Sequence, residues 1–448
     1  MKLHDKKRGT VNLSPPSILA LGFLALIILG TLLLKLPVSH HGELPWLHAM
    51  FTATSAVTIT GLSVVNVGEA YTVFGKVVIM LLLQCGGLGF MTFAILAVMS
   101  LSPKLGLKQQ IMAQETIGQT SLKKVTFTIK GVFLYSLFFE IVGTVILTVA
   151  WLQDYNFAQA LFYAAFYSIS AFNNGGFSLF PNSLMSFADQ YVITFTISML
   201  YIIGGIGFLV LMDIKRNKSW RKLSPNSKLI LSTIAGLNVF AFIAIWGLEA
   251  SNPLTLASMS VGEQAVNAWF HATVPRSSGF NSLPVEQMSD ASALVTMMLM
   301  FIGGCSGSTA GGIKITRLVI LLKAGWAELL RTLHPRIVYS IRMGEREINP
   351  IIVGNITRFF FLYILVFIVL TILISLSGIP IMESMGLIAA CMSSVGPAFG
   401  IVGPTSTYNC LSDWARFISI WAMILGRLEI FTLLVIMRPD FWRDKQNW

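Results

Sequence analysis

The sequence predicts an all-α polytopic membrane protein in which four tandem helix–pore-loop–helix repeats surround a pseudo-fourfold pore. Of its 448 residues, 55% are hydrophobic and only 11% are charged, whereas an ordinary soluble domain has about 25% charged residues. The mean hydropathy is +0.74, more apolar surface than a soluble protein can bury. Long apolar runs alternate with shorter semi-apolar segments, and four of these segments lead into a polar strip that closes with glycine.

The apolar runs set the number of spans, because a membrane-crossing helix needs about 20 mainly apolar residues. Between the two runs of each pair lies a segment too short to cross, which we expect to re-enter the membrane. This pattern divides the chain into repeats 1–110, 111–222, 223–345 and 346–448, the third with a broken second helix. The eight runs are 18–36, 72–100, 127–152, 190–212, 229–249, 291–322 (interrupted), 356–377 and 411–437, and the re-entrant segments are 47–57, 158–172, 266–274 and 384–392.

Lysine and arginine orient these spans. Basic residues fill the two termini and the loops 102–124, 213–228 and 323–346, whereas the opposite segments together hold only Arg276. Because Lys-rich and Arg-rich loops stay on the cytoplasmic side, we expect a multi-pass protein of the inner (plasma) membrane with both termini in the cytoplasm. These loops either dock an acidic partner or only satisfy the orientation rule. The formal charge of +11 does not indicate nucleic-acid binding, because it is not gathered on one folded face.

The four polar strips close with glycines at positions 61, 176, 279 and 396, at intervals of roughly 100 to 120 residues that indicate one repeat used four times. Irregular backbone at membrane depth survives only where protein covers it or water lines it, and a ring of carbonyl oxygens can replace the hydration shell of a monovalent cation. Turning carbonyls inward requires positive φ, which glycine adopts most readily. The alternative at each strip is a packing turn between helices. The candidate filter residues are Thr58, Ile59, Thr60, Gly61, Asn173, Asn174, Gly175, Gly176, Ser277, Ser278, Gly279, Ser394, Val395 and Gly396.

A glycine-rich run, 303–312, interrupts the sixth span just inside the third strip, and five of its ten residues are glycine. Such a run is a poor helix interior. We hypothesise a flexible intramembrane gate, with a close-packed small-residue interface as the alternative. The shorter runs 86–90 and 204–208 look like packing sites. The candidate gate residues are Gly303, Gly304, Gly307, Ser308, Thr309, Gly311, Gly312 and, in the eighth span, Arg427.

Arg427 and Glu140 lie well inside predicted spans, where charge is costly and usually faces a cavity or a partner. Arg427 precedes Glu429 by two residues. Facing the pore it would repel cations and help to stop leak; alternatively it forms an ion pair with Glu429 or Glu140. Glu140, alone in the third span, either lowers the barrier for a cation or simply pairs.

The residues 57–62, 171–177, 275–281 and 303–312 resemble the corresponding motifs of the Trk/Ktr/HKT superfamily of potassium transporters. The first half is similar to the Ktr type, and the second, through 334–340 and 426–433, to the Trk type. The resemblance implies K⁺ uptake across the cell membrane through a central pore with one filter strip per repeat, K⁺ bound by the filter residues, and a gate at 303–312 with Arg427. It also implies a homodimer and a cytosolic nucleotide-binding regulatory subunit.

One glycine per strip, rather than the longer strip of strict potassium channels, implies weaker discrimination of K⁺ from Na⁺. The alternative function is therefore a nonselective Na⁺/K⁺ pathway or an ion-coupled cation symporter. Alternating access with inverted repeats is disfavoured, because all four repeats run in the same direction. The sequence contains no H-E-x-x-H, G-x-S-x-G or paired carboxylate set, so we expect no enzyme. Beyond K⁺ we expect no cofactor in this chain, and its surroundings are membrane lipid.

Overall fold

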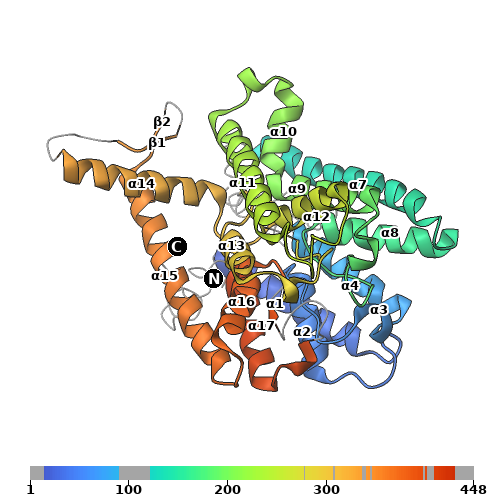
Figure 1. Cartoon of the computed structure of the whole chain (residues 1–448). Coiled ribbons are helices and arrows are strands. Elements are labelled where there is room, and N and C mark those ends of the chain that lie inside the picture. The colour runs from blue at the N-terminus through green and yellow to red at the C-terminus, as the bar shows by residue number, and fades with distance from the viewer. Residues whose placement is uncertain are drawn as a thin grey trace, which may run out of the picture.

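The computed structural model describes residues 15–89, 122–276, 278–305, 308–334, 340–343, 346–396, 399–400 and 408–428, and there the protein is helical apart from one small hairpin. Figure 1 shows a bundle from which one helix, α14, projects with this hairpin beside it. The elements are α1 Pro15–Lys35, α2 Trp46–Val57, α3 Val67–Ala70, α4 Val73–Gly87, α7 Leu122–Trp151, α8 Phe157–Phe172, α9 Tyr191–Ile206, α10 Phe208–Asn217, α11 Pro225–Glu249, α12 Val261–Thr273, α13 Asp290–Phe301, α14 Ile315–Leu333, β1 Arg342–Met343, β2 Arg346–Glu347, α15 Pro350–Ser375, α16 Ile381–Ser393 and α17 Asp413–Arg427. Short 3-10 turns lie at Met185–Phe187, Trp220–Lys222, Val274–Arg276, Val285–Gln287 and Tyr408–Cys410.

The helices group into four sets, each with a short helix among longer ones. Helix α2 packs against α1 and α4, α8 against α7 and α9, and α16 against α15 and α17, while α11 contacts both α12 and α13. Neighbouring sets are joined in the same way each time: α4 contacts α8, α9 contacts α12, α13 contacts α16, and α17 contacts α2. The last of these contacts closes a ring and brings the two ends of the described chain together.

The four short helices lie where the sequence predicts re-entrant segments. Side-chain caps mark the start of two of them. Asn156 caps α8 through its side chain, and Ser260 with Glu263 forms a capping box on α12, which satisfies N–H groups that a helix start leaves free. The last two turns of α2, from Phe51 to Val57, are buried throughout. Because these turns are rich in Ala, Ser and Thr, neighbouring helices can approach their backbone closely.

The long helices carry the membrane-facing surface. Within the described residues, three helices are long and apolar enough to cross a membrane (Lys130–Trp151, Pro225–Glu249 and Pro350–Ser375), and a fourth counts if the bent pair α9–α10 is one span. Large apolar side chains such as Leu134, Ile243 and Phe361 are exposed on them, as expected for contact with lipid. The predicted runs 72–100 and 411–437 continue outside the described residues.

Two predicted spans differ from the structure. The run 190–212 is not one straight helix: α9 ends at Ile206, Gly207 adopts φ +94°, and α10 leaves at a bend of 95°. The run 291–322 resumes after its break as α14, which continues to Leu333 and projects from the bundle in Figure 1. Charges at Lys323 and Arg331 make α14 amphipathic rather than a spanning helix, and Lys323 Nζ donates to the Arg342 carbonyl of the hairpin at 2.7 Å.

Candidate functional site

Each polar strip begins where a short helix ends, and its backbone turns in the same way. All four closing glycines have positive φ: Gly61 +85°, Gly176 +68°, Gly279 +73° and Gly396 +108°. This conformation was predicted, because glycine is the residue type that adopts it without strain. Two residues before the glycine, three strips place a second left-handed residue, at Ile59, Asn174 and Ser394. The equivalent Ser277 lies outside the described residues.

The strips use their N–H groups to close the short helices. In three strips the N–H before the closing glycine bonds five residues back, Thr60 to Ser55 at 2.8 Å, Gly175 to Ser170 at 2.7 Å and Val395 to Ala390 at 3.0 Å. In the third strip, Ser278 N donates to Val274 O at 3.1 Å. The carbonyls of Thr60, Gly175, Ser278 and Val395 accept no hydrogen bond from the described parts of the chain. The strips therefore hold acceptors that are free to bind a cation.

The four closing glycines form a ring in chain order. A Cβ on Gly61 would lie 3.1 Å from Gly176 Cα, and one on Gly176 would lie 3.4 Å from Gly279 Cα. A Cβ on Gly396 would lie 3.4 Å from Gly279 Cα and 3.8 Å from Gly61 Cα. Segments more than 300 residues apart therefore meet at one point, and no side chain fits between them. Thr58, Ile59, Asn173, Asn174, Ser278 and Ser394 are all buried around this ring.

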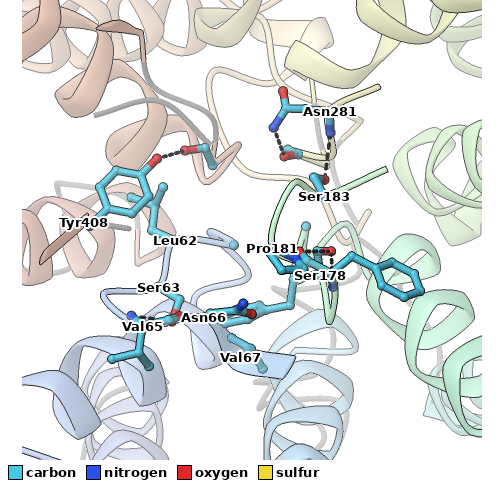
Figure 2. A pocket seen from close by; sticks show the side chains of 16 residues that line it. Leu62, Ser63, Val65, Asn66, Val67, Ser178, Pro181, Ser183, Asn281 and Tyr408 are labelled. Atoms are coloured by element: carbon cyan, nitrogen blue, oxygen red, sulfur yellow. Dashed lines mark hydrogen bonds between the residues drawn. The ribbon is translucent and has the colours of Figure 1, made fainter. Parts of the chain in front are cut away.

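A pocket of about 150 Å³ with a mixed polar and apolar lining opens at the ring, and all four closing glycines line it. Figure 2 shows Asn66, Ser178, Asn281 and Tyr408 around it. Tyr408 Oη donates to Gly396 O at 3.4 Å, and Asn281 Nδ2 donates to Gly279 O at 3.3 Å. Sequence reasoning missed both residues. Asn281 stands two residues after its glycine, but Tyr408 is twelve residues away and carries no signal in the sequence.

The glycine-rich run contacts the strips at their earlier residues, so it lies at the end opposite the pocket. Thr309 Oγ1 accepts a hydrogen bond from Asn174 Nδ2 and donates to Phe172 O at 3.3 Å. A Cβ on Gly311 would lie 2.7 Å from Ser394 Cβ of the fourth strip. The run therefore touches the second and fourth strips directly.

The run is fixed at its two ends by backbone bonds. Gly303 N donates to Ile313 O at 3.0 Å, and Cys305 N donates to Gly205 O of α9 at 3.1 Å. Gly312 adopts φ +68°. A Cβ on Gly304 would lie 2.8 Å from Ser308 Oγ, so the run packs against itself, while Gly307 lies outside the described residues. These contacts make the described part of the run a small, close-packed segment.

Arg427 reaches the same run from the fourth set of helices. Its Nη1 donates to Thr309 O at 2.9 Å and its Nη2 donates to Gly86 O at 2.6 Å. It forms no ion pair with Glu140, although both residues belong to the described part of the chain, and Glu429 lies outside it. Arg427 thus clamps the glycine-rich run to α4.

Glycines also let the helices after three strips approach the strips closely. A Cβ on Gly86, Gly204 or Gly426 would press on the carbonyl oxygen of Val57, Phe172 or Met392, the equivalent residue of each strip. The prediction of packing sites at the runs 86–90 and 204–208 is confirmed for Gly86 and Gly204. Among the described glycines of the third set, none makes the equivalent contact with its strip.

Gly86→Ala should lower the free energy of unfolding by about 1–3 kcal/mol, the usual cost of overpacking. The added methyl would meet the Val57 backbone, which cannot move aside as a flexible side chain does. Thermal unfolding of the purified variant tests this. Gly236→Ala is the matched control, because its Cβ would meet nothing within 4 Å on α11, and it should raise stability by about 0.5–1 kcal/mol. An equal response of both variants would contradict the close approach at Gly86.

The described residues of this site offer backbone oxygen atoms rather than a cluster of metal-ligating side chains. No group of three or more His, Cys, Asp or Glu side chains among the described residues could hold a metal ion. Converging backbone carbonyls instead suit a weakly hydrated monovalent cation. The structure brings all described candidate filter and gate residues to one place, and leaves none of them elsewhere.

The fold thus defines an all-α polytopic membrane protein of transporter type. The chain matches the TrkH family, described as cation transport protein, over residues 15–444. It therefore belongs to this family of transporters and is not an enzyme, which confirms the resemblance seen in the sequence.

Individual relatives cover almost the whole chain. The chain is 37% identical to the Ktr system potassium uptake protein B of Bacillus subtilis (strain 168), over 96% of this chain and 94% of that protein. It is 32% identical to the potassium/sodium uptake protein NtpJ of Enterococcus hirae, over 99% of this chain and 97% of that protein. The crystal structure of the potassium transporter TrkH from Vibrio parahaemolyticus superposes with a TM-score of 0.77 at 25% identity, covering 99% of this chain and 88% of that one.

Proposed function

We propose that this chain takes up K⁺ across the cell membrane through a central pore formed by the four repeats 1–110, 111–222, 223–345 and 346–448. The observation that carries this function is the buried ring of four closing glycines with acceptor carbonyls free beside them. A cation in this ring would exchange its water shell for carbonyl oxygens. The negative C-terminal ends of the four short helices point toward the strips and favour a cation there.

In this proposal the filter binds K⁺ and no other cofactor is needed. Its ligands come from residues 58–61, 173–176, 277–279 and 394–396. Selectivity rests on one closing glycine per strip, so the second candidate function is a nonselective Na⁺/K⁺ pathway or an ion-coupled symporter. The relative named as a potassium/sodium uptake protein favours keeping this second candidate.

The run 303–312 acts in this proposal as the gate, and Arg427 holds it closed. Support comes from its position across the ends of the second and fourth strips and from the clamp between Thr309 O and Gly86 O. The alternative, a permanent packing interface, predicts that loosening these contacts lowers stability without raising flux.

The cellular setting is also proposed. The basic loops place both termini in the cytoplasm of a cell whose plasma (inner) membrane holds the chain, with lipid around the exposed apolar helices. Several relatives are named as proteins of Ktr and Trk systems. These names support a partnership with other subunits, and we propose, as the resemblance to the family implies, that the chain works as a homodimer with a cytosolic nucleotide-binding regulatory subunit.

The proposed transport is tested by ⁸⁶Rb⁺ uptake into proteoliposomes that hold the purified chain, with K⁺ or Na⁺ as competitor. Uptake blocked more effectively by K⁺ than by Na⁺ is the expected result. Equal block by both ions would favour the nonselective alternative. No uptake, even after a cytosolic regulatory subunit has been added, would contradict the function.

A further inference from the structure

A buried polar cluster lies directly behind the second filter strip. It consists of Gln84 on α4, Ser136 and Glu140 on α7, and Asn173 in the strip itself. The Glu140 Oε1 atom accepts from Ser136 Oγ at 2.8 Å, from Gln84 Nε2 at 3.0 Å and from Asn173 Nδ2 at 3.1 Å. Gln84 Nε2 also lies 3.1 Å from Oε2. Three donors that converge on one carboxyl group favour its ionised form, whereas its burial favours the protonated form.

The cluster is built as one unit with the strip. Asn173 Nδ2 also donates to Gln84 Oε1 at 2.7 Å, so the side chains of Gln84, Glu140 and Asn173 each contact the other two. Ser168 of the short helix α8 donates to the Glu140 backbone carbonyl at 2.7 Å. The Glu140 carboxylate is therefore hydrogen-bonded directly to Asn173, a residue of the proposed filter.

This carboxylate has no basic partner among the described residues. Two arginines inside the helix bundle bind other groups: Arg276 donates to Asn238 Oδ1, and Arg427 donates to two backbone carbonyls. A buried carboxyl group stays ionised only when it is paired or bound to a cation, and otherwise it takes up a proton. Glu140 is 5% exposed, so bulk water does not replace that partner. Since no described residue supplies a positive charge to Glu140, a cation in the proposed filter is the counter-charge that would keep it ionised.

We propose that Glu140 is the counter-charge of the permeating cation, and that it sets the affinity of the filter for monovalent cations without discriminating between K⁺ and Na⁺. The inference rests on the proposed filter. A carboxylate acts through its field and attracts both ions equally, whereas discrimination depends on the carbonyl geometry of the strips. Affinity and selectivity are thereby assigned to different residues of one site.

Glu140→Gln removes the charge and keeps the shape of the side chain. The variant should bind K⁺ and Na⁺ more weakly by a similar factor, roughly tenfold at the effective dielectric of protein interiors, with the K⁺/Na⁺ ratio unchanged. The measurement is the thermal stabilisation of the purified full chain by KCl or NaCl, with choline chloride holding the ionic strength constant, because ligand binding raises the unfolding temperature according to its dissociation constant.

A charge-relocation variant separates this role from a structural one. Gln84 and Glu140 contact each other, so the double variant Gln84→Glu/Glu140→Gln returns a carboxylate to the same cluster and should restore the affinity. Thr144→Val, one turn along α7, is the matched control, since its hydroxyl donates only to the Glu140 backbone carbonyl, and it should leave both ion affinities unchanged.

Three results would overturn the proposal: unchanged K⁺ affinity in folded Glu140→Gln, a changed K⁺/Na⁺ ratio without a change in affinity, or a double variant that does not restore the affinity. If Glu140→Gln does not fold, the double variant alone decides: wild-type affinity supports the role and weakened affinity overturns it. A wild-type chain that K⁺ does not stabilise would instead count against the filter itself.

Discussion

Replacing Gly176 by serine should lower the preference for K⁺ over Na⁺ by about tenfold or more. Gly176 adopts φ +68°, where a residue with a Cβ loses about 1–2 kcal/mol. The new Cβ would also press on Ser278 O of the third strip. The second and third strips would have to separate, which would displace the carbonyl oxygens that bind the ion. A loss of about 1.4 kcal/mol in the binding of one ion already changes its affinity tenfold. Competition of K⁺ and Na⁺ with ⁸⁶Rb⁺ uptake measures this preference.

Gly42→Ser controls for backbone strain alone. Gly42 has nearly the same φ, +71°, but a Cβ there would meet nothing within 4 Å, and the residue lies outside the strips. Its variant should keep the wild-type preference. Relative fluxes that stay unchanged in a folded Gly176→Ser protein would remove Gly176 from the filter.

Replacing Arg427 by glutamine should raise ⁸⁶Rb⁺ uptake by about tenfold. The guanidinium donates to Thr309 O and Gly86 O, and a hydrogen bond from a charged group contributes about 1.5–3 kcal/mol. If these bonds hold the run 303–312 across the pathway, their loss shifts the gate toward its open state. If Arg427 faces the proposed pathway, removing its positive charge also removes a repulsion that cations would meet there.

Thr309→Val tests the same gate from its other side. It removes the hydroxyl that joins Asn174 and Phe172 to the run, and it leaves the Thr309 carbonyl available to Arg427. Its uptake should also rise. Arg358→Gln, an exposed charge on α15, is the control and should behave as wild type. Lower stability with unchanged uptake in both gate variants would instead favour a permanent packing interface.

The features that the sequence predicts are those that depend on residue type or on apolar length. Gly61 and Gly396 were predicted in left-handed conformation because only glycine adopts it freely, and α2 and α16 were predicted because their apolar segments are too short to cross. Ile59 has the same left-handed backbone conformation. The sequence does not predict it there, because β-branched residues rarely adopt positive φ. Tertiary contact overrides the local preference there.

The remaining features depend on contacts between distant segments. The bond between Asn174 and Thr309 joins residues 135 positions apart, and the clamp of Arg427 on Gly86 joins residues 341 positions apart. No local pattern encodes either pairing. The bend at Gly207 was missed for a related reason: apolar residues continue on both sides of it, so hydropathy predicts one straight span.

In the proposed pore, a cation loses its water shell inside the ring of closing glycines. Anomalous diffraction from crystals grown in RbCl tests it most directly, because Rb⁺ substitutes for K⁺ and scatters anomalously. We expect an anomalous peak on the axis among Gly61, Gly176, Gly279 and Gly396, within coordination distance of the strip carbonyls. This peak should weaken as K⁺ replaces Rb⁺. A well-ordered ring without a peak in saturating Rb⁺, or a peak only at another place in the protein, would contradict it.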